Sequence, residues 1–163
     1  MKQLLIVYHT VTGGTLQMAR AAAAGGSRES TVRVRLETAA DADPDALLES
    51  SGYLFACPEN LAAMSGMMKD FFDRTYYPVL ENLQGRPYAT LICAGSDGTN
   101  AARQIERIAT GWRLKAIADP LIICTHAQTP QEILKPKHIA PADLARCEEL
   151  GATLAAGLDL GIF

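Results

Sequence analysis

The chain has no long apolar run, no block of basic residues and no closely spaced pair of cysteines. No apolar stretch reaches the roughly 18 residues that a helix needs to cross a bilayer, so we expect no membrane insertion. The first apolar run stops at Tyr8 and His9, and no small-residue cleavage site follows it, which argues against a signal peptide. We therefore expect a cytoplasmic protein.

The charge and the length restrict the class of protein further. A formal net charge of −3 without a basic block argues against nucleic acid as a partner. A hydrophobic content of 48% with 20% charged residues is ordinary for a globular protein and argues against disorder. The 163 residues can enclose one full core, so we expect residues 1–163 to form a single domain.

The four cysteines, Cys57, Cys93, Cys124 and Cys147, are widely separated and form no Cys-x-x-Cys pair. The first three fall near the carboxyl ends of three predicted neighbouring strands, so a metal or redox cluster is one interpretation. They lack metal-ligand spacing, and buried cysteine commonly serves as a small hydrophobe. We expect packing residues and no metal site.

Apolar runs alternate with helical stretches, which is typical of a parallel sheet covered on both faces. We predict strands over 4–8, 32–36, 53–57, 88–94 and 121–124. Helices are predicted over 16–24, 44–50, 64–79, 101–112 and from 141 onward. Gly25 and Gly26 are expected to stop the first helix. Thr125 to Ala140 holds two prolines without a clear period, which predicts a long loop that covers a site.

The third predicted helix follows a loop over Pro58 to Met64 and carries an apolar stripe at helical spacing. The stripe consists of Met64, Met67, Met68, Phe71, Phe72, Tyr76 and Val79. Such a stripe of methionines and aromatic residues can resemble a cofactor box, but its spacing indicates core packing.

The segment from Ile6 to Ala19 joins an apolar run to an alanine-rich amphipathic stretch through a turn of threonine and glycine. This pattern predicts a strand, a tight loop and a helix N-terminus, where free backbone N–H groups and the helix dipole favour an anion. The turn carries three threonine hydroxyls and no lysine or arginine, so neutral donors would hold a bound phosphate.

The turn lacks residues that three other kinds of phosphate-binding loop require. No lysine follows Gly14, which excludes a nucleotide P-loop. Gly13 and Gly14 do not supply the three spaced glycines of a dinucleotide fingerprint, and no cysteine nucleophile stands in the turn. For the motif taken alone, a glycine turn before an ordinary helix remains the alternative.

The turn from Thr10 to Thr15 resembles the first loop of the flavodoxin-like superfamily, which reads Ser/Thr-x-Thr-Gly-x-Thr and holds the phosphate of FMN. The segment from Pro58 to Arg74 resembles the NAD(P)H:quinone oxidoreductase and NADPH-dependent FMN reductase branch. That branch has a Pro-initiated loop followed by Met-Ser-Gly-x-Met-Lys-x-Phe-x-Asp. The resemblance implies an α/β, flavodoxin-like three-layer sandwich, with a five-stranded parallel sheet in the order 2-1-3-4-5 and helices on both faces.

The resemblance also implies an FMN site at the switch point of the sheet, where three polar loops converge. The residues expected at the phosphate are His9, Thr10, Val11, Thr12, Gly13, Gly14 and Thr15. Those expected on one side of the isoalloxazine are Pro58, Glu59, Asn60, Leu61 and Ala62. Those expected on the other side are Ala94, Gly95, Ser96 and Gly98.

Two features of this chain bear on the chemistry. The branch usually has an arginine, an aromatic residue and a glycine where this chain has Asn60, Leu61 and Ala62, so less ring stacking is expected. His126 begins the long loop and is a candidate catalytic proton donor at the flavin edge, although loop histidines are often merely solvated.

These observations favour an FMN flavoprotein that takes electrons from NADH or NADPH and reduces a quinone or another small-molecule acceptor. Two alternatives stay open: a flavodoxin-type electron carrier that binds redox proteins, and an FMN-free interaction module of the same fold. The branch commonly forms dimers or tetramers, so the resemblance implies a homodimer or homotetramer.

Overall fold

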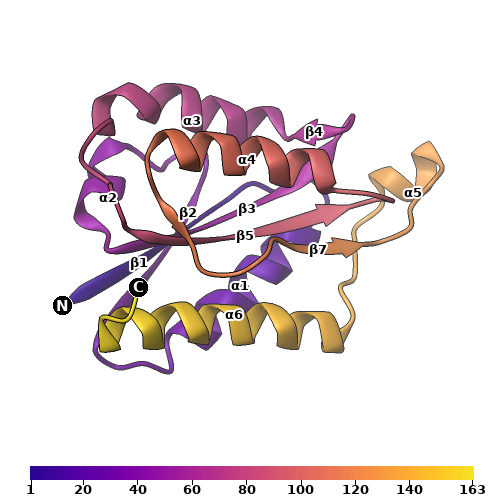
Figure 1. Ribbon diagram of the computed structural model, residues 1–163. Coiled ribbons are helices and arrows are strands. Elements are labelled where there is room, and N and C mark those ends of the chain that lie inside the picture. The colour runs from indigo at the N-terminus through magenta and orange to yellow at the C-terminus, as the bar shows by residue number, and fades with distance from the viewer.

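The computed structural model describes all residues from Met1 to Phe163, with a parallel sheet between two layers of helices (Figure 1). The central strands are β1 (Lys2–Tyr8), β2 (Val32–Thr38), β3 (Gly52–Asn60) and β5 (Pro87–Ala94). They lie in the order β2-β1-β3-β5, and β6 (Lys115–Ala116) and β7 (Leu121–Cys124) both pair with β5 on its outer side. The predicted fold class and strand order are confirmed.

The outer edge of the sheet is one interrupted strand. Its first piece, β6, pairs with the start of β5, and its second piece, β7, pairs with the end of β5. Asp119 and Pro120 fall between the two pieces, where proline has no N–H to donate to a ladder. The sequence predicted only the apolar second piece, because Lys115 and Ala116 are too short and exposed to give a strand pattern.

Helices cover both faces of the sheet. One face carries α2 (Pro44–Glu49), α3 (Gly66–Val79) and α4 (Thr99–Gly111), while α1 (Gly14–Gly26) and α6 (Pro141–Leu160) cover the other (Figure 1). Alternate residues of a strand point to opposite faces, so Leu5 and Val7 join the core under α3 and α4. Leu4 and Ile6 join the core against α1 and α6.

The first helix was expected to end before Gly25 and Gly26, but α1 includes both residues and ends at Gly26. They are buried where α1 crosses α6, and a Cβ on Gly25 would lie 1.9 Å from the carbonyl oxygen of Glu148. From the other helix, a Cβ on Gly151 would lie 1.9 Å from the carbonyl oxygen of Ala22. Gly25 and Gly151 therefore permit close backbone contact between the two helices.

Three other expectations need correction. Met64 lies on the short strand β4 (Ala63–Met64), which pairs antiparallel with the end of β3, so the predicted loop contains a hairpin. Met67 is 41% exposed and does not pack in the core. The predicted loop over 125–140 contains the short helix α5 (Pro130–Leu134), which begins with a capping box formed by Thr129 and Glu132.

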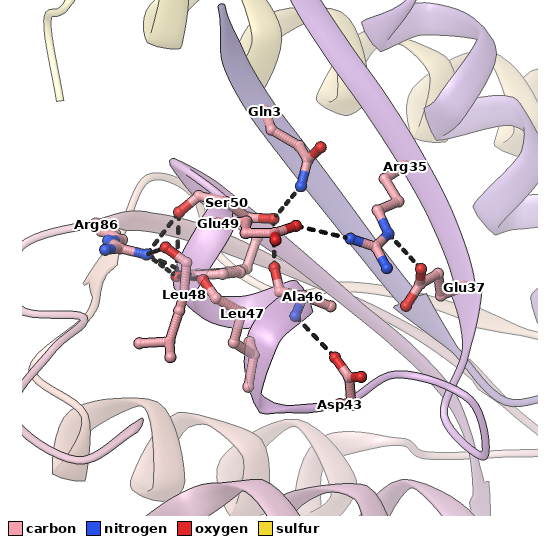
Figure 2. A network of polar contacts seen from close by, with 11 residues as sticks. Gln3, Arg35, Glu37, Asp43, Ala46, Leu47, Leu48, Glu49, Ser50 and Arg86 are labelled. Carbon is pink, nitrogen blue, oxygen red and sulfur yellow. Dashed lines mark hydrogen bonds and ion pairs between the residues drawn. The ribbon is translucent and has the colours of Figure 1, made fainter. Parts of the chain in front are cut away.

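A polar network at the amino ends of the strands fixes α2 in place (Figure 2). Asp43 caps the helix by accepting a hydrogen bond of 2.8 Å from the backbone N–H of Ala46. Arg86 donates to the carbonyl oxygens of Leu47 and Ser50 at the other end of α2, at 3.0 and 2.6 Å. The contacts agree with the prediction of a short helix that starts at Asp43 and Pro44.

None of the helices combines the length and the apolar character that a membrane crossing requires.

Candidate functional site

Three loops gather at the carboxyl ends of β1, β3 and β5, where Figure 1 also places β4 and α5. A main cavity of about 460 Å³ lies there. It is lined by Thr12, Pro58, Glu59, Asn60, Leu61, Ala62, Cys93, Ala94, Gly95, Ser96, Thr125, Ala127, Gln128, Ile133 and Lys137. The loops that the sequence predicted to converge therefore line one cavity.

A second hollow of about 200 Å³, the loop cavity, adjoins the main cavity. Its lining consists of Thr10, Val11, Thr12, Gly14, Thr15, Pro58, Asn60, Cys93, Ile133 and Leu134. Thr12, Asn60 and Ile133 line both cavities, so an elongated ligand can occupy the two together. A larger hollow of about 540 Å³ on α6 is an open surface groove. Two of its lining residues, Arg28 and Glu148, pair with each other, and no loops from the strand ends line it.

The turn before α1 is built to accept an anion. Thr10 Oγ1 accepts a hydrogen bond of 3.0 Å from the N–H of Gly13, which has a left-handed φ of 92°. The first intrahelical bond runs from Gln17 N–H to Gly13 O at 3.2 Å, so the N–H groups of Gly14, Thr15 and Leu16 have no acceptor within the helix. These three donors and the helix dipole favour negative charge.

The hydroxyl of Thr15 is the most informative atom of the loop cavity. Thr15 is 1% exposed, and its Oγ1 is buried without any hydrogen-bond partner in the protein. Buried hydroxyls are normally paired, so an orphaned one needs an explanation, and a missing ligand is a direct one. A phosphate group offers several strong acceptor oxygens, and the turn offers the Thr15 hydroxyl and free backbone N–H groups as donors. The residues of this turn therefore fit the phosphate of FMN.

The hairpin formed by β3 and β4 makes one wall of the main cavity. Leu61 and Ala62 at its turn both have positive φ, 50° and 61°, which matches a type I′ turn without the glycine that such turns favour. Leu61 is fully exposed to solvent at the tip. Both residues line the cavity as predicted, and neither offers an aromatic ring.

The segment from Ala94 to Gly98 makes the opposite wall. Two of its carbonyl groups accept hydrogen bonds from the residues that follow β7. Thr125 N–H donates to Ala94 O and His126 N–H donates to Gly95 O, each at 2.8 Å. Ala94, Gly95 and Ser96 line the cavity, while Gly98, at φ 89°, is the N-cap residue of α4. A Cβ at Gly98 would meet the side chain of Ile122 at 2.6 Å, so both its conformation and its packing require glycine.

The two histidines singled out from the sequence lie outside the cavity linings. His9 Nδ1 lies 2.8 Å from the hydroxyl of Ser65, which connects the first loop to the start of α3. Burial lowers the pKa of the His9 imidazole and so favours its neutral form. His126 has an exposed side chain and a φ of 60°, and its backbone is engaged with Gly95. Its role as a proton donor stays a prediction.

The sequence predicted that the 125–140 segment covers a site but not which of its residues line the cavities, namely Thr125, Ala127, Gln128, Ile133, Leu134 and Lys137. The segment is tied to the first loop, because Gln17 Nε2 donates to Lys137 O at 2.7 Å and Lys137 N–H donates to Thr12 O at 2.9 Å. The capping pattern of Thr129, Pro130 and Glu132 was a readable signal for α5.

The cysteines behave as packing residues. All four are free; Cys57, Cys93 and Cys147 are buried, and burial raises the pKa of their thiols to about 12, 11 and 12. Cys93 also lines both cavities, which the sequence did not indicate. No group of three or more His, Cys, Asp or Glu side chains is arranged to hold a metal ion.

The raised thiol pKa values predict a loss of stability at alkaline pH. An unfolded thiol ionises near pH 9.0, whereas Cys57 in the fold keeps its proton up to about pH 12, so the unfolded state gains stability as pH rises through this window. At pH 10.5 Cys57 alone should cost about 2 kcal/mol relative to pH 8. Urea unfolding should show that the free energy of unfolding falls less between pH 8 and pH 10.5 for Cys57→Ala than for the wild type. An identical fall in both proteins would contradict a raised pKa of the Cys57 thiol.

Comparisons with known proteins identify the family. A model of the NADPH-dependent FMN reductase family matches residues 37–128. A flavodoxin from Aquifex aeolicus is 33% identical over 96 residues, which cover 59% of this chain and 50% of that protein. An NAD(P)H dehydrogenase (quinone) from Acidithiobacillus ferrooxidans is 30% identical over 95 residues, covering 46% of this chain and 48% of that protein. The chain spans about half the length of these curated relatives.

Solved structures establish the same fold. A flavodoxin from the domain Archaea superposes with a TM-score of 0.80 at 24% identity, covering 96% of this chain and 99% of the other. A flavodoxin, WrbA-like protein from Agrobacterium tumefaciens gives 0.75 at 16% identity, covering 98% and 99%. The fold is flavodoxin-like, and because the family model spans more than half of the chain, the protein belongs to the NADPH-dependent FMN reductase family.

Proposed function

We propose that the protein binds FMN, with the phosphate on the turn from Thr10 to Thr15 and the isoalloxazine in the main cavity. The observation that carries the proposal is the buried, unpartnered hydroxyl of Thr15 at the N-terminus of α1. The loop cavity around it continues into a larger cavity walled by two loops, which suits a ligand with an anionic end and a planar end.

We propose further that the protein is an NAD(P)H-dependent oxidoreductase that reduces a quinone or another small acceptor. FMN supplies the hydride and electron chemistry, while the protein binds and orients it. The family description and the quinone-reducing relative from Acidithiobacillus support this activity. The turn of Leu61 and Ala62 leaves the cavity wall without an aromatic ring, so a second planar molecule has room to stack.

The charged side chains of the main cavity are already engaged within the protein. Lys137 Nζ donates to the carbonyl oxygens of Glu132, Ile133 and Lys135 at 2.9, 2.7 and 2.6 Å. Glu59 accepts two backbone hydrogen bonds from the region of α4. Lys137 keeps its positive charge, but these three carbonyl groups use its donors, so an acceptor in this cavity meets no free cationic hydrogen-bond donor.

An electron carrier is the second candidate, because the Aquifex flavodoxin is 33% identical over its matched half. Absorption spectra with and without added FMN test cofactor binding first. Anaerobic addition of NADH or NADPH to the FMN-loaded protein then separates the candidates. The enzyme proposal expects the bound FMN to be bleached by at least one nicotinamide and reoxidised by a quinone. Bound FMN that neither nicotinamide reduces would make the carrier the better assignment.

Leu61→Trp should tighten FMN binding while slowing quinone reduction. An indole at the hairpin tip can stack over the isoalloxazine ring of FMN. It then occupies the space that a nicotinamide needs in order to bring its donor carbon within roughly 3–3.5 Å of flavin N5. The measurements are a fluorescence titration and steady-state kinetics, with Leu61→Ala as the matched variant. Faster turnover in the tryptophan variant would contradict an open ring face.

We also propose that the chain self-associates. Val11, Leu61, Ile133 and Leu134 are exposed apolar side chains, and each lines one or both cavities. Exposed apolar surface at a site commonly marks an interface. Light scattering after gel filtration should give a dimer or tetramer, and a monomer at tens of micromolar would contradict this part of the proposal.

A further inference from the structure

Three side chains join the β3–β4 hairpin to α4, and we call this set the hairpin clamp. Glu59 accepts hydrogen bonds from the N–H groups of Gly98 and Ala101, at 2.9 Å to Oε1 and 3.1 Å to Oε2. Asn100 Nδ2 donates to Ala62 O at 2.5 Å. Gln104 Oε1 accepts from the N–H of Met64 at 2.8 Å. The clamp therefore fixes both ends of the hairpin turn against one helix.

Glu59 replaces a cap that α4 does not supply itself. The N-cap residue Gly98 has no side chain, and the first turn of α4 holds no acidic residue. The exposed Asp97 carboxylate accepts hydrogen bonds from Thr99 alone, from its N–H at 3.1 Å and its hydroxyl at 2.7 Å, so it does not reach the N–H groups of Gly98 and Ala101. A carboxylate from β3 thus satisfies two N–H groups at the α4 N-terminus and opposes the positive end of its dipole.

The two elements that Glu59 connects are the opposite walls of the main cavity. Asn60, Leu61 and Ala62 belong to the hairpin wall, and Ala94, Gly95 and Ser96 belong to the wall that leads into α4. Glu59 is itself a lining residue, but both of its carboxylate oxygens are used by backbone N–H groups. Through these two contacts Glu59 joins the hairpin wall to the α4 wall and sets their spacing.

We infer that Glu59 is a positioning residue for the FMN site: it holds the two walls of the isoalloxazine cavity at a fixed spacing and places one negative charge in that cavity's lining. The inference rests on the proposed FMN binding. It differs from the role expected from the sequence, in which Glu59 would contact the flavin directly.

Glu59→Gln separates the two parts of this role. The glutamine amide has one acceptor oxygen and one NH₂ group, so it can accept from only one of the two N–H groups, those of Gly98 and Ala101. Its NH₂ group would face the other N–H, and that hydrogen bond between the hairpin and α4 is lost. Losing one hydrogen bond to a charged group should weaken FMN binding roughly tenfold. Removing the charge leaves only the exposed Asp97 carboxylate to oppose the α4 dipole, which favours the electron-rich reduced cofactor, so the midpoint potential of bound FMN should rise.

Two matched variants make the test specific. Asn100→Ala removes a neutral member of the clamp, so it should weaken FMN binding by a factor of several without moving the potential. Asp43→Asn removes a carboxylate cap from the remote helix α2 and should change neither FMN affinity nor potential. The measurements are FMN dissociation constants by fluorescence and potentials by anaerobic dye equilibration. Thermal unfolding of each variant without FMN reports folding.

Each outcome decides a different statement. A wild type that does not bind FMN would overturn the proposed function. A wild type that binds FMN, together with a folded Glu59→Gln variant of unchanged affinity and potential, would overturn the positioning role alone. Weaker binding with an unchanged potential would overturn the electrostatic part. If Glu59→Gln does not fold, an Asn100→Ala variant with wild-type affinity would overturn the clamp, and weakened affinity with an unmoved potential would support it.

Discussion

Replacing Gly151 by alanine is expected to destabilise the fold by about 3 kcal/mol or more, a large part of the stability of a typical domain. The new Cβ would lie 1.9 Å from the carbonyl oxygen of Ala22, and its neighbours are backbone atoms that cannot rotate away. Gly25→Ala meets the carbonyl oxygen of Glu148 at the same distance. Either variant has to push α1 and α6 apart along the contact that closes one core.

The control is Gly66→Ala at the start of α3. A Cβ there meets no atom within 4 Å, and alanine favours a helix over glycine, so this variant should keep or slightly raise the stability. The measurement is the free energy of unfolding in urea for the three variants and the wild type. Gly151→Ala with wild-type stability would show that the two helices do not approach as closely as described.

Changing Thr12 and Thr15 together to alanine should weaken FMN binding by roughly 1–3 kcal/mol, the cost of removing hydroxyl donors from a bound phosphate. Thr15→Val replaces the hydroxyl by a methyl group of similar size, so it should leave the FMN-free protein as stable as the wild type or more stable. The reason is that it removes a buried hydroxyl that has no partner without creating a cavity. Weaker FMN binding without a loss of stability distinguishes a ligand-binding hydroxyl from a structural one. Lower stability of FMN-free Thr15→Val would contradict the assignment.

The sheet and the first loop could be predicted because their signals are local. A continuous apolar run such as Tyr53 to Cys57 marks a buried parallel strand, and charged residues alternating with Val32, Val34 and Leu36 mark an edge. The turn from Thr10 to Thr15 carries its own chemistry in six residues. These features led to the confirmed strand order and to the placement of the cavity.

The features that could not be predicted depend on residues distant in sequence. Gly25 was expected only to stop the first helix, and its packing role depends on the contact of α1 with Gly151 and its neighbours on α6. Leu61 and Ala62 carry no turn signal, and the hairpin is held by Asn100 and Gln104 on α4. The 125–140 segment was expected to cover a site, but which of its residues line the cavities depends on its anchoring by Gln17, a residue more than 100 positions away.

The most direct test of the FMN site compares FMN with riboflavin, which lacks the phosphate. If the turn from Thr10 to Thr15 holds the phosphate, the wild type should bind FMN at least about tenfold more tightly than riboflavin, as expected for charge-assisted hydrogen bonds. The Thr12→Ala, Thr15→Ala double variant should lose most of that preference while keeping its riboflavin affinity. Equal affinities of the wild type for FMN and riboflavin, or a preference that survives in the double variant, would contradict the account.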